Sequence, residues 1–136
     1  MTVSNRPSLG LYEQATRFYE RGRYREALPL AEQACEPGQG QDPTLADSLT
    51  LLADLHRELG HFAQAEQPYL QALSIKAASL GKEHPGYART LHGLARLYEW
   101  TGQYAQAAPL FDTALAIRRR ALGEHHPDYA QTLHDI

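Results

Sequence analysis

The feature that most constrains this chain is a 42-residue internal repeat. Pro43, Pro85 and Pro127 are spaced by this length, and residues 42–83 align with residues 84–125 at 15 identical positions without a gap. A repeat unit of this size cannot bury its own hydrophobic face, so neighbouring units must stack on one another. The sequence therefore predicts an array of stacked units.

Within each unit the hydrophobic spacing is helical. Four leucines between residues 49 and 59 recur at intervals of three and four, and a second stripe runs from Ala65 to Ile75. Gly60 separates the two stripes, and glycine closes a helix because it adopts the left-handed conformation at little cost. Asp42-Pro43 and His84-Pro85 have the form of helix starts, an N-cap followed by proline. Each unit is predicted to be a helix, a tight turn and a second helix.

The two clear units extend into weaker copies on both sides, and we treat residues 1–136 as one domain. About residues 8–41 form a degenerate first repeat, in which Gly22 and Ala27 match Gly60 and Ala65. Residues 42–83 and 84–125 are the second and third repeats, and residues 126–136 begin a fourth. Cys35 falls where the later repeats carry leucine, which favours a buried thiol over a reactive one.

These residues resemble the tetratricopeptide repeat, in the 42-residue form found in kinesin light chains. The resemblance rests on the motif His-Pro-x-x-Ala-x-Thr-Leu-x-x-Leu-Ala-x-Leu-Tyr from His84 to Tyr98, and on Gly-Gln-Tyr-Ala-Gln-Ala from Gly102 to Ala107. It implies an all-α fold, a right-handed α-solenoid of antiparallel helix pairs. It also implies that the first helix of each pair lines a concave groove that often holds a peptide.

The same resemblance indicates which residues face the groove. Kinesin-light-chain repeats often carry paired asparagines there, but this chain has Thr50-Leu51 and His92-Gly93, so the same grip on a peptide backbone is not expected. Arginine and tryptophan often dominate binding energy, which favours a ligand-binding role for this face. Alternatively, Trp100 packs against the next repeat and the arginines are only solvated. The candidate groove residues are Tyr12, Tyr19, Asp47, Asp54, Arg57, Arg89, His92, Arg96, Glu99 and Trp100.

Motifs for catalysis, metals and cofactors do not stand out. His84, His125 and His126 form the obvious histidine group, but no carboxylate or cysteine lies at ligand spacing with them. The sequence has no glycine-rich phosphate loop, no Gly-x-Ser-x-Gly and no His-Glu-x-x-His. We therefore expect no enzymatic activity, no metal and no cofactor.

Charge and cysteine content limit the partners and the compartment. The formal net charge is −3, which gives no general basic surface for nucleic acid. The basic run Arg118–Arg120 is interpreted as a complement to a helix carboxyl end, with nucleic-acid binding through it as the alternative. A single cysteine fits a reducing, cytoplasmic compartment. No apolar run approaches the ~18 residues of a membrane span, so no membrane partner is expected.

The leading functional hypothesis is a protein- or peptide-binding scaffold that uses the concave face and belongs to a larger protein. A second is a self-assembly segment. The apolar face formed by Ala130 and Leu133 would have no partner helix to cover it, and this favours a homo-oligomer. A third is the sensor arm of a multidomain signalling protein, with catalysis beyond Ile136.

Overall fold

The computed structural model describes residues 7–36 and 43–122, and within these ranges the chain is helical without strands. The helices are α1 (Pro7–Glu20), α2 (Tyr24–Ala34), α3 (Pro43–Glu58), α4 (Phe62–Ser79), α5 (Pro85–Trp100) and α6 (Tyr104–Leu122). The all-α prediction is confirmed. The partial repeat assigned to residues 126–136 lies outside the described residues. No helix of the described part is both long and apolar enough to cross a membrane.

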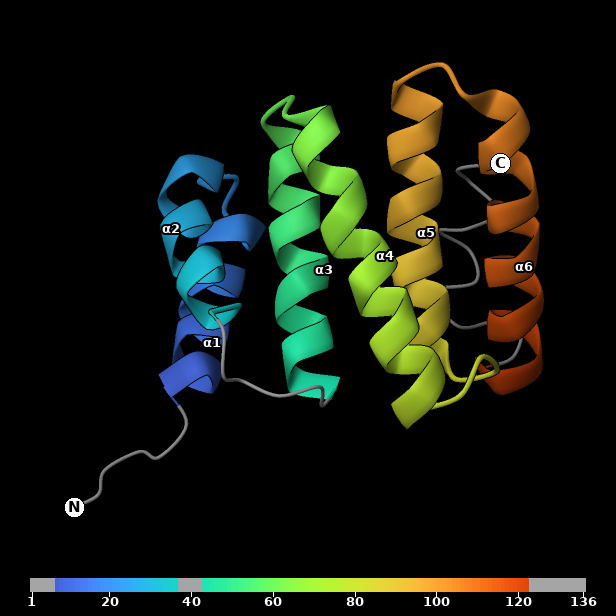
Figure 1. The fold of residues 1–136 in the computed structure, drawn as a ribbon, viewed down its shortest axis with the longest axis horizontal. Coiled ribbons are helices and arrows are strands. Elements are labelled where there is room, and N and C mark those ends of the chain that lie inside the picture. The colour runs from blue at the N-terminus through green and yellow to red at the C-terminus, as the bar shows by residue number, and fades with distance from the viewer. Residues whose placement is uncertain (1–6, 37–42, 123–136) are drawn as a thin grey trace.

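The helices form three antiparallel pairs, α1 with α2, α3 with α4 and α5 with α6, which stack side by side (Figure 1). The turns within the pairs lie at one end of the stack in this view. Contacts of α3 with α1 and with α5 place the first helices of the pairs next to each other. This is the α-solenoid that the repeat predicts, and its first helices share one face.

The helix boundaries follow from the capping residues. His84 caps α5, because its Nδ1 accepts a hydrogen bond of 2.9 Å from the backbone N–H of Gly86, and Pro85 begins the helix. Gly60 and Gly102 have φ of 83° and 82°, the left-handed region in which glycine is favoured. Each turn then directs the chain back along the helix that precedes it, as the sequence predicts.

The core between the helices of a pair is made of small residues that allow close approach. Ala53 and Ala65 are fully buried, as is Ala95 of the next pair, while Tyr69 fills the larger space in the same cluster. Cys35 is half-buried and packs against a neighbouring cluster, and burial raises the pKa of its thiol to about 12. The thiol is therefore a protonated packing group, in agreement with the sequence interpretation.

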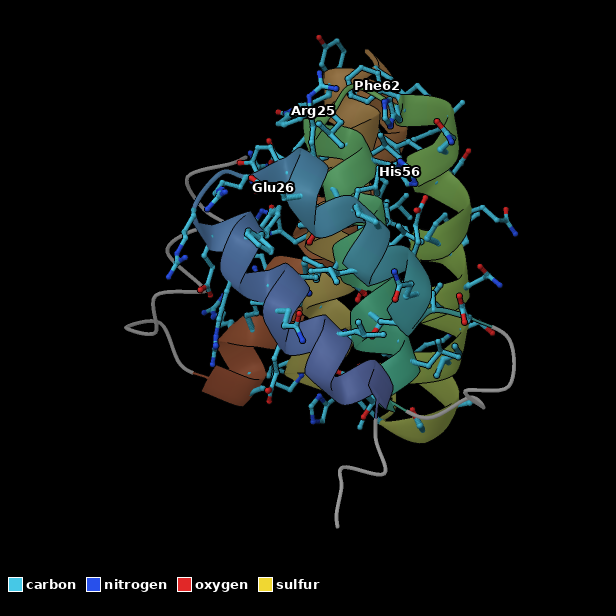
Figure 2. All side chains as sticks on the ribbon, turned by 90° about the vertical axis from the view of Figure 1, so that its left-hand side faces the viewer. Arg25, Glu26, His56 and Phe62 are labelled. Atoms are coloured by element: carbon cyan, nitrogen blue, oxygen red, sulfur yellow. The ribbon has the colours of Figure 1, made fainter. Side chains whose placement is uncertain are left out.

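A histidine pair at the α3–α4 turn should make stability depend on pH. His56 is buried near the start of α4 (Figure 2), and its Nδ1 lies 3.2 Å from Nδ1 of His61. Burial and then His61 lower the pKa of His56, against an opposing effect of Glu32. The folded protein thus binds fewer protons than the unfolded chain, whose histidine pKa is about 6.5. The free energy of unfolding should fall as pH drops below about 6.5, and urea denaturation at several pH values measures this.

The control for this prediction comes from the repeat itself. Position 98 of the third repeat corresponds to position 56 and carries tyrosine, so His56→Tyr introduces a residue that the architecture already accepts. This variant should lose part of the acid sensitivity. An unchanged pH profile in His56→Tyr would show that other groups cause the effect.

Candidate functional site

The face formed by the first helices contains a pocket of about 170 Å³. Its lining comes from α1, α3, α5 and α6, so it spans all three helix pairs. We call it the arginine pocket, because four of its eight lining residues are arginines. The lining residues are Tyr19, Asp54, Arg57, Arg89, His92, Gly93, Arg96 and Arg118.

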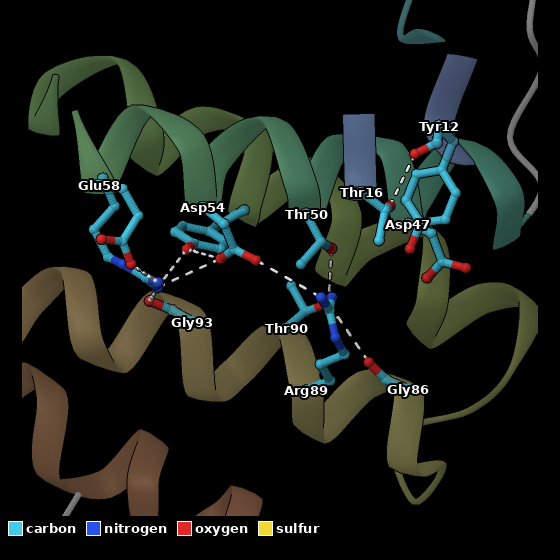
Figure 3. Close-up of polar contacts among 12 residues, drawn as sticks. Tyr12, Thr16, Asp47, Thr50, Asp54, Glu58, Gly86, Arg89, Thr90 and Gly93 are labelled. Atoms are coloured by element: carbon cyan, nitrogen blue, oxygen red, sulfur yellow. Dashed lines mark hydrogen bonds and ion pairs between the residues drawn. The ribbon is translucent and has the colours of Figure 1, made fainter. Parts of the chain in front are cut away.

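One wall of the pocket is a buried polar network between α3, α4 and α5. Arg57 Nη1 donates to the Tyr69 hydroxyl at 2.8 Å, and more weakly to Asp54 Oδ1 and the Gly93 carbonyl, each at 3.4 Å. The Tyr69 hydroxyl donates in turn to Asp54 Oδ1. Figure 3 shows Asp54 on α3 facing Gly93 across the gap to α5. The network therefore links the second and third repeats through side chains that are largely buried, with Asp54 10% and Arg57 4% exposed.

The protonation states of this wall follow from burial. Burial, and next the charge of Asp54, raise the pKa of Tyr69 well above its usual value of 10. The same two causes raise the pKa of Tyr19 to about 12. Both hydroxyls stay protonated at neutral pH, and the Tyr69 hydroxyl remains a donor to Asp54.

The opposite wall is made by α5 and α6. Arg118 Nη1 lies 2.8 Å from His92 Nδ1, and because a guanidinium only donates, this nitrogen of His92 accepts and carries no proton. The His92 ring also meets the Phe111 ring edge to face, with centroids 5.6 Å apart. His92 is thus fixed in one tautomer between a cation and an aromatic ring.

Trp100 lies beside the pocket, where two cations stack on it. The guanidinium carbons of Arg57 and Arg96 lie 5.1 and 5.4 Å from its ring centroid, and Phe62 meets it edge to face at 6.4 Å. The Trp100 residue is still 40% exposed. The ring is thus held by its own and the preceding repeat while one part of it faces solvent.

Four of the predicted groove residues do not line the arginine pocket, and of these Trp100 lies beside it. Asp47 pairs with the buried Lys76 at 3.1 Å, and Lys76 Nζ also donates to the Gly86 carbonyl at 3.1 Å. Tyr12 is half-buried against the core of the first helix pair. Glu99 is half-buried and outside the lining. The other predicted residues line the pocket together, and Trp100 lies next to it. Their role in binding stays a prediction.

The pocket also contains Gly93 and Arg118, which sequence reasoning did not select. Arg118 was expected to complement a helix end, but it is 5% exposed and lines the pocket. A signal was present in the repeat, since Arg118 stands 42 residues after Lys76, the buried cation of the preceding unit. A cation conserved in position between two units indicates an inward side chain.

The repeat also shows why the pocket is rich in cations. Residue 89 corresponds to Asp47 and residue 96 to Asp54, and both positions carry arginine in the third repeat. The charge at these two positions of the inner face thus changes from negative in the second repeat to positive in the third. Arg89 Nη2 reaches back to Asp54 Oδ2 at 3.8 Å, which links the two units (Figure 3).

Metal ligands are not grouped in the described part of the chain. It contains no cluster of three or more His, Cys, Asp or Glu side chains placed to hold an ion. His84 serves as the cap of α5, and His125 and His126 lie outside the described residues.

Comparison with known proteins identifies what the chain is similar to. The tetratricopeptide repeat model matches residues 45–86 and again residues 88–128. The fold is similar to the crystal structure of a putative kinesin light chain with nearly identical repeats from Podosopora anserina, at 28% identity and a TM-score of 0.83. That match covers 97% of this chain and 65% of the other. The structure of BtubC (BKLC) from P. vanneervenii matches with a TM-score of 0.77 and 26% identity, over 94% of this chain and 54% of that one.

One curated protein shares local sequence with the chain. A probable assembly chaperone of rpl4 from Emericella nidulans is 35% identical over 65 residues, which are 48% of this chain. The match spans only 17% of that protein's length.

Proposed function

The chain belongs to the tetratricopeptide repeat family, and on that premise we propose that it is a scaffold module that binds a protein or peptide on the face formed by α1, α3 and α5. The observation that carries the proposal is the arginine pocket, where side chains from all three helix pairs converge beside a partly exposed Trp100. Arginine grips carboxylates and phosphates through paired donors, and tryptophan supplies a large rigid contact. A partner held here would contact every repeat of the described stack.

The similar proteins support a protein partner over catalysis. One of them is named a probable assembly chaperone of rpl4. A scaffold needs shape and charge on a rigid face, which the α-solenoid supplies, and it needs no reactive group. We therefore propose no enzymatic step for this chain.

The proposal is tested by retention of a partner from lysate of the native host. We expect the wild-type chain to retain a protein that the double variant Arg96→Ala, Trp100→Ala does not. These substitutions remove the cation and the ring that stack on each other at the edge of the pocket. Circular dichroism must show that the variant keeps its helices.

The matched control removes the same kinds of side chain elsewhere. Arg25 and Tyr104 are exposed and outside the arginine pocket, so Arg25→Ala, Tyr104→Ala should retain the partner. Equal retention by all three proteins would show that the partner binds another surface. If none retains a partner, self-assembly becomes the better hypothesis, and concentration-dependent mass in solution tests it.

A further inference from the structure

The outer side of α1, at the amino-terminal end of the stack, contains a second hollow of about 250 Å³. Figure 2 looks onto this end of the stack, with α1 and α2 in front. The hollow shares no residue with the arginine pocket. We call it the amino-terminal hollow, and its lining residues are Gln14, Arg17, Phe18 and Arg21.

The two internal interfaces show what lies on this side of a first helix. The helix α3 packs against α2, and α5 packs against α4, so the second helix of one pair covers the first helix of the next. On α3 the covered side includes Leu52 and Leu55, which pack in one core cluster with Ala27 and Ala31 of α2. Among the described helices α1 packs mainly against α2 and α3. The outer side of α1 is therefore a place where a further helix fits.

The residues on this side of α1 are polar where the later repeats are apolar. Each of them stands 38 residues before its counterpart in the second repeat. Arg17 thus takes the position of Leu55, and it is exposed whereas Leu55 is fully buried. Gln14 and Arg21 also stand where the second repeat has leucine, and both are exposed. A leucine-rich helix would bury these polar groups without partners, so the side is suited to a polar helix.

The charge of this side comes from two arginines one helical turn apart. Arg17 and Arg21 project from the same face of α1, and neither forms an ion pair with a described residue. Glu13, one turn before Arg17, is exposed as well, so two positive charges stand against one negative charge. A helix with carboxylates one turn apart can pair with both arginines, since such carboxylates also share one face.

The chain itself contains an example of such a contact. Tyr98 holds in the third repeat the position that Phe18 holds in the first, and its hydroxyl donates to Glu66 Oε2 of the preceding helix α4 at 2.6 Å. The Phe18 ring is half-buried and carries the Arg23 guanidinium at 5.2 Å from its centroid. A preceding helix that places a carboxylate next to this position is thus already part of the architecture.

We propose that the amino-terminal hollow binds an acidic helix of a partner protein, which packs on α1 as α4 packs on α5. Its contacting face carries small side chains beside Phe18 and carboxylates opposite Arg17 and Arg21. The inference goes beyond the proposed function, because it assigns a second surface that is separate from the arginine pocket. A helix is favoured over nucleic acid, which needs many cations along a track of phosphates and would be repelled by Glu13.

The test is an NMR titration of the isotope-labelled chain, which detects weak binding and locates it. The probe is a capped, alanine-rich helical peptide with glutamate at every fourth position, and its control has glutamine in place of each glutamate. A lysine version and a short oligothymidylate complete the set. We expect the glutamate peptide to bind at least about fivefold more tightly than the glutamine peptide, a difference of about 1 kcal/mol. The lysine peptide should not bind. The amide signals expected to shift are those of Gln14, Arg17, Phe18 and Arg21.

The double variant Arg17→Gln, Arg21→Gln should bind the glutamate and glutamine peptides equally. Both side chains are exposed, so the substitutions should leave the fold intact. The matched control Arg25→Gln, Arg120→Gln removes the same charge from exposed positions outside the hollow and should bind like the wild type. Equal loss in this control would overturn the inference, because it would indicate general charge attraction.

Other outcomes overturn the inference in distinct ways. Shifts confined to Arg89, Arg96 and Trp100 would place the acidic peptide in the arginine pocket, and the scaffold proposal would then stand alone. Tighter binding of the oligothymidylate, lost in the Arg17→Gln, Arg21→Gln variant, would assign the hollow to nucleic acid. No shift with any probe would leave this side as a polar cap of the stack. The lysate experiment with Arg96→Ala, Trp100→Ala tests the proposed function separately, since those residues lie outside the hollow.

Discussion

Asp54→Ala is expected to lower the free energy of unfolding by about 1–3 kcal/mol, because it removes the acceptor of a buried hydroxyl and leaves Arg57 with Glu58, at 3.2 Å, as its remaining carboxylate. The side chains of Asp54 and Arg57 are only 10% and 4% exposed, so water replaces the lost interaction only in part. The Tyr69 hydroxyl also loses the carboxylate to which it donates. Urea denaturation followed by circular dichroism measures the change.

The matched control is a pair of the same sequence spacing on the surface. Arg23 and Glu26 form an ion pair three residues apart, as do Asp54 and Arg57, but their side chains are about half exposed. Glu26→Ala should therefore cost no more than about 1 kcal/mol. Similar losses for Asp54→Ala and Glu26→Ala would refute burial as the cause. Adding Arg57→Met to Asp54→Ala should recover part of the loss, because it removes the buried cation that has lost one of its two carboxylates.

The sequence was sufficient for the fold because the information is repeated. The 42-residue spacing of prolines and glycines sets the helix boundaries, and the alanines beside each turn indicate which faces pack together. Gly60 and Gly102 both close their helices as predicted. When a pattern occurs twice in one chain, each copy supports the interpretation of the other.

The depth of individual side chains was harder to predict, because it depends on the neighbouring unit. A charged residue near a helix end is ordinarily solvated, so Arg118 was interpreted as a complement to the end of its helix, yet it is 5% exposed and lies 2.8 Å from His92 of the adjoining helix. Lys76 is also buried, and its Nζ donates a hydrogen bond to the Gly86 carbonyl at the start of α5. Periodicity shows which way a residue points, whereas burial is decided by the residues of another repeat.

Gly93 illustrates the same dependence and gives the second large effect. A Cβ atom at position 93 would lie 2.7 Å from the Tyr69 ring, closer than real contacts allow. Gly93→Ala should thus displace Tyr69 from Asp54 and destabilise the protein by about 1–3 kcal/mol through overpacking. This loss is expected although alanine favours a helix over glycine by about 1 kcal/mol. Thermal or urea unfolding measures it.

Gly10→Ala is the control, since it is the same substitution within a helix but meets no atom within 4 Å. It should be neutral or stabilising, and a loss equal to that of Gly93→Ala would show that the clash is not the cause. Tyr69→Leu provides a second test, because it removes the ring atoms that the new Cβ would meet. In that background Gly93→Ala should no longer destabilise.

The reason for this glycine lies in how the repeats divide space between them. In the preceding interface the position of Tyr69 is taken by Ala31, and the position of Gly93 by Leu51. Ala31 and Leu51 share one core cluster. At the first interface the large residue is therefore on the first helix of the following unit. At the second interface the large residue is Tyr69, on the second helix of the preceding unit. Tyr69 also carries a hydroxyl. This hydroxyl can bridge Asp54 and Arg57 only because the residue opposite the ring is a glycine. Exchange of the two residues, Tyr69→Ala with Gly93→Leu, should therefore restore packing volume but not the polar wall of the pocket. Such a variant should fold more stably than Tyr69→Ala alone and still lose affinity for the partner.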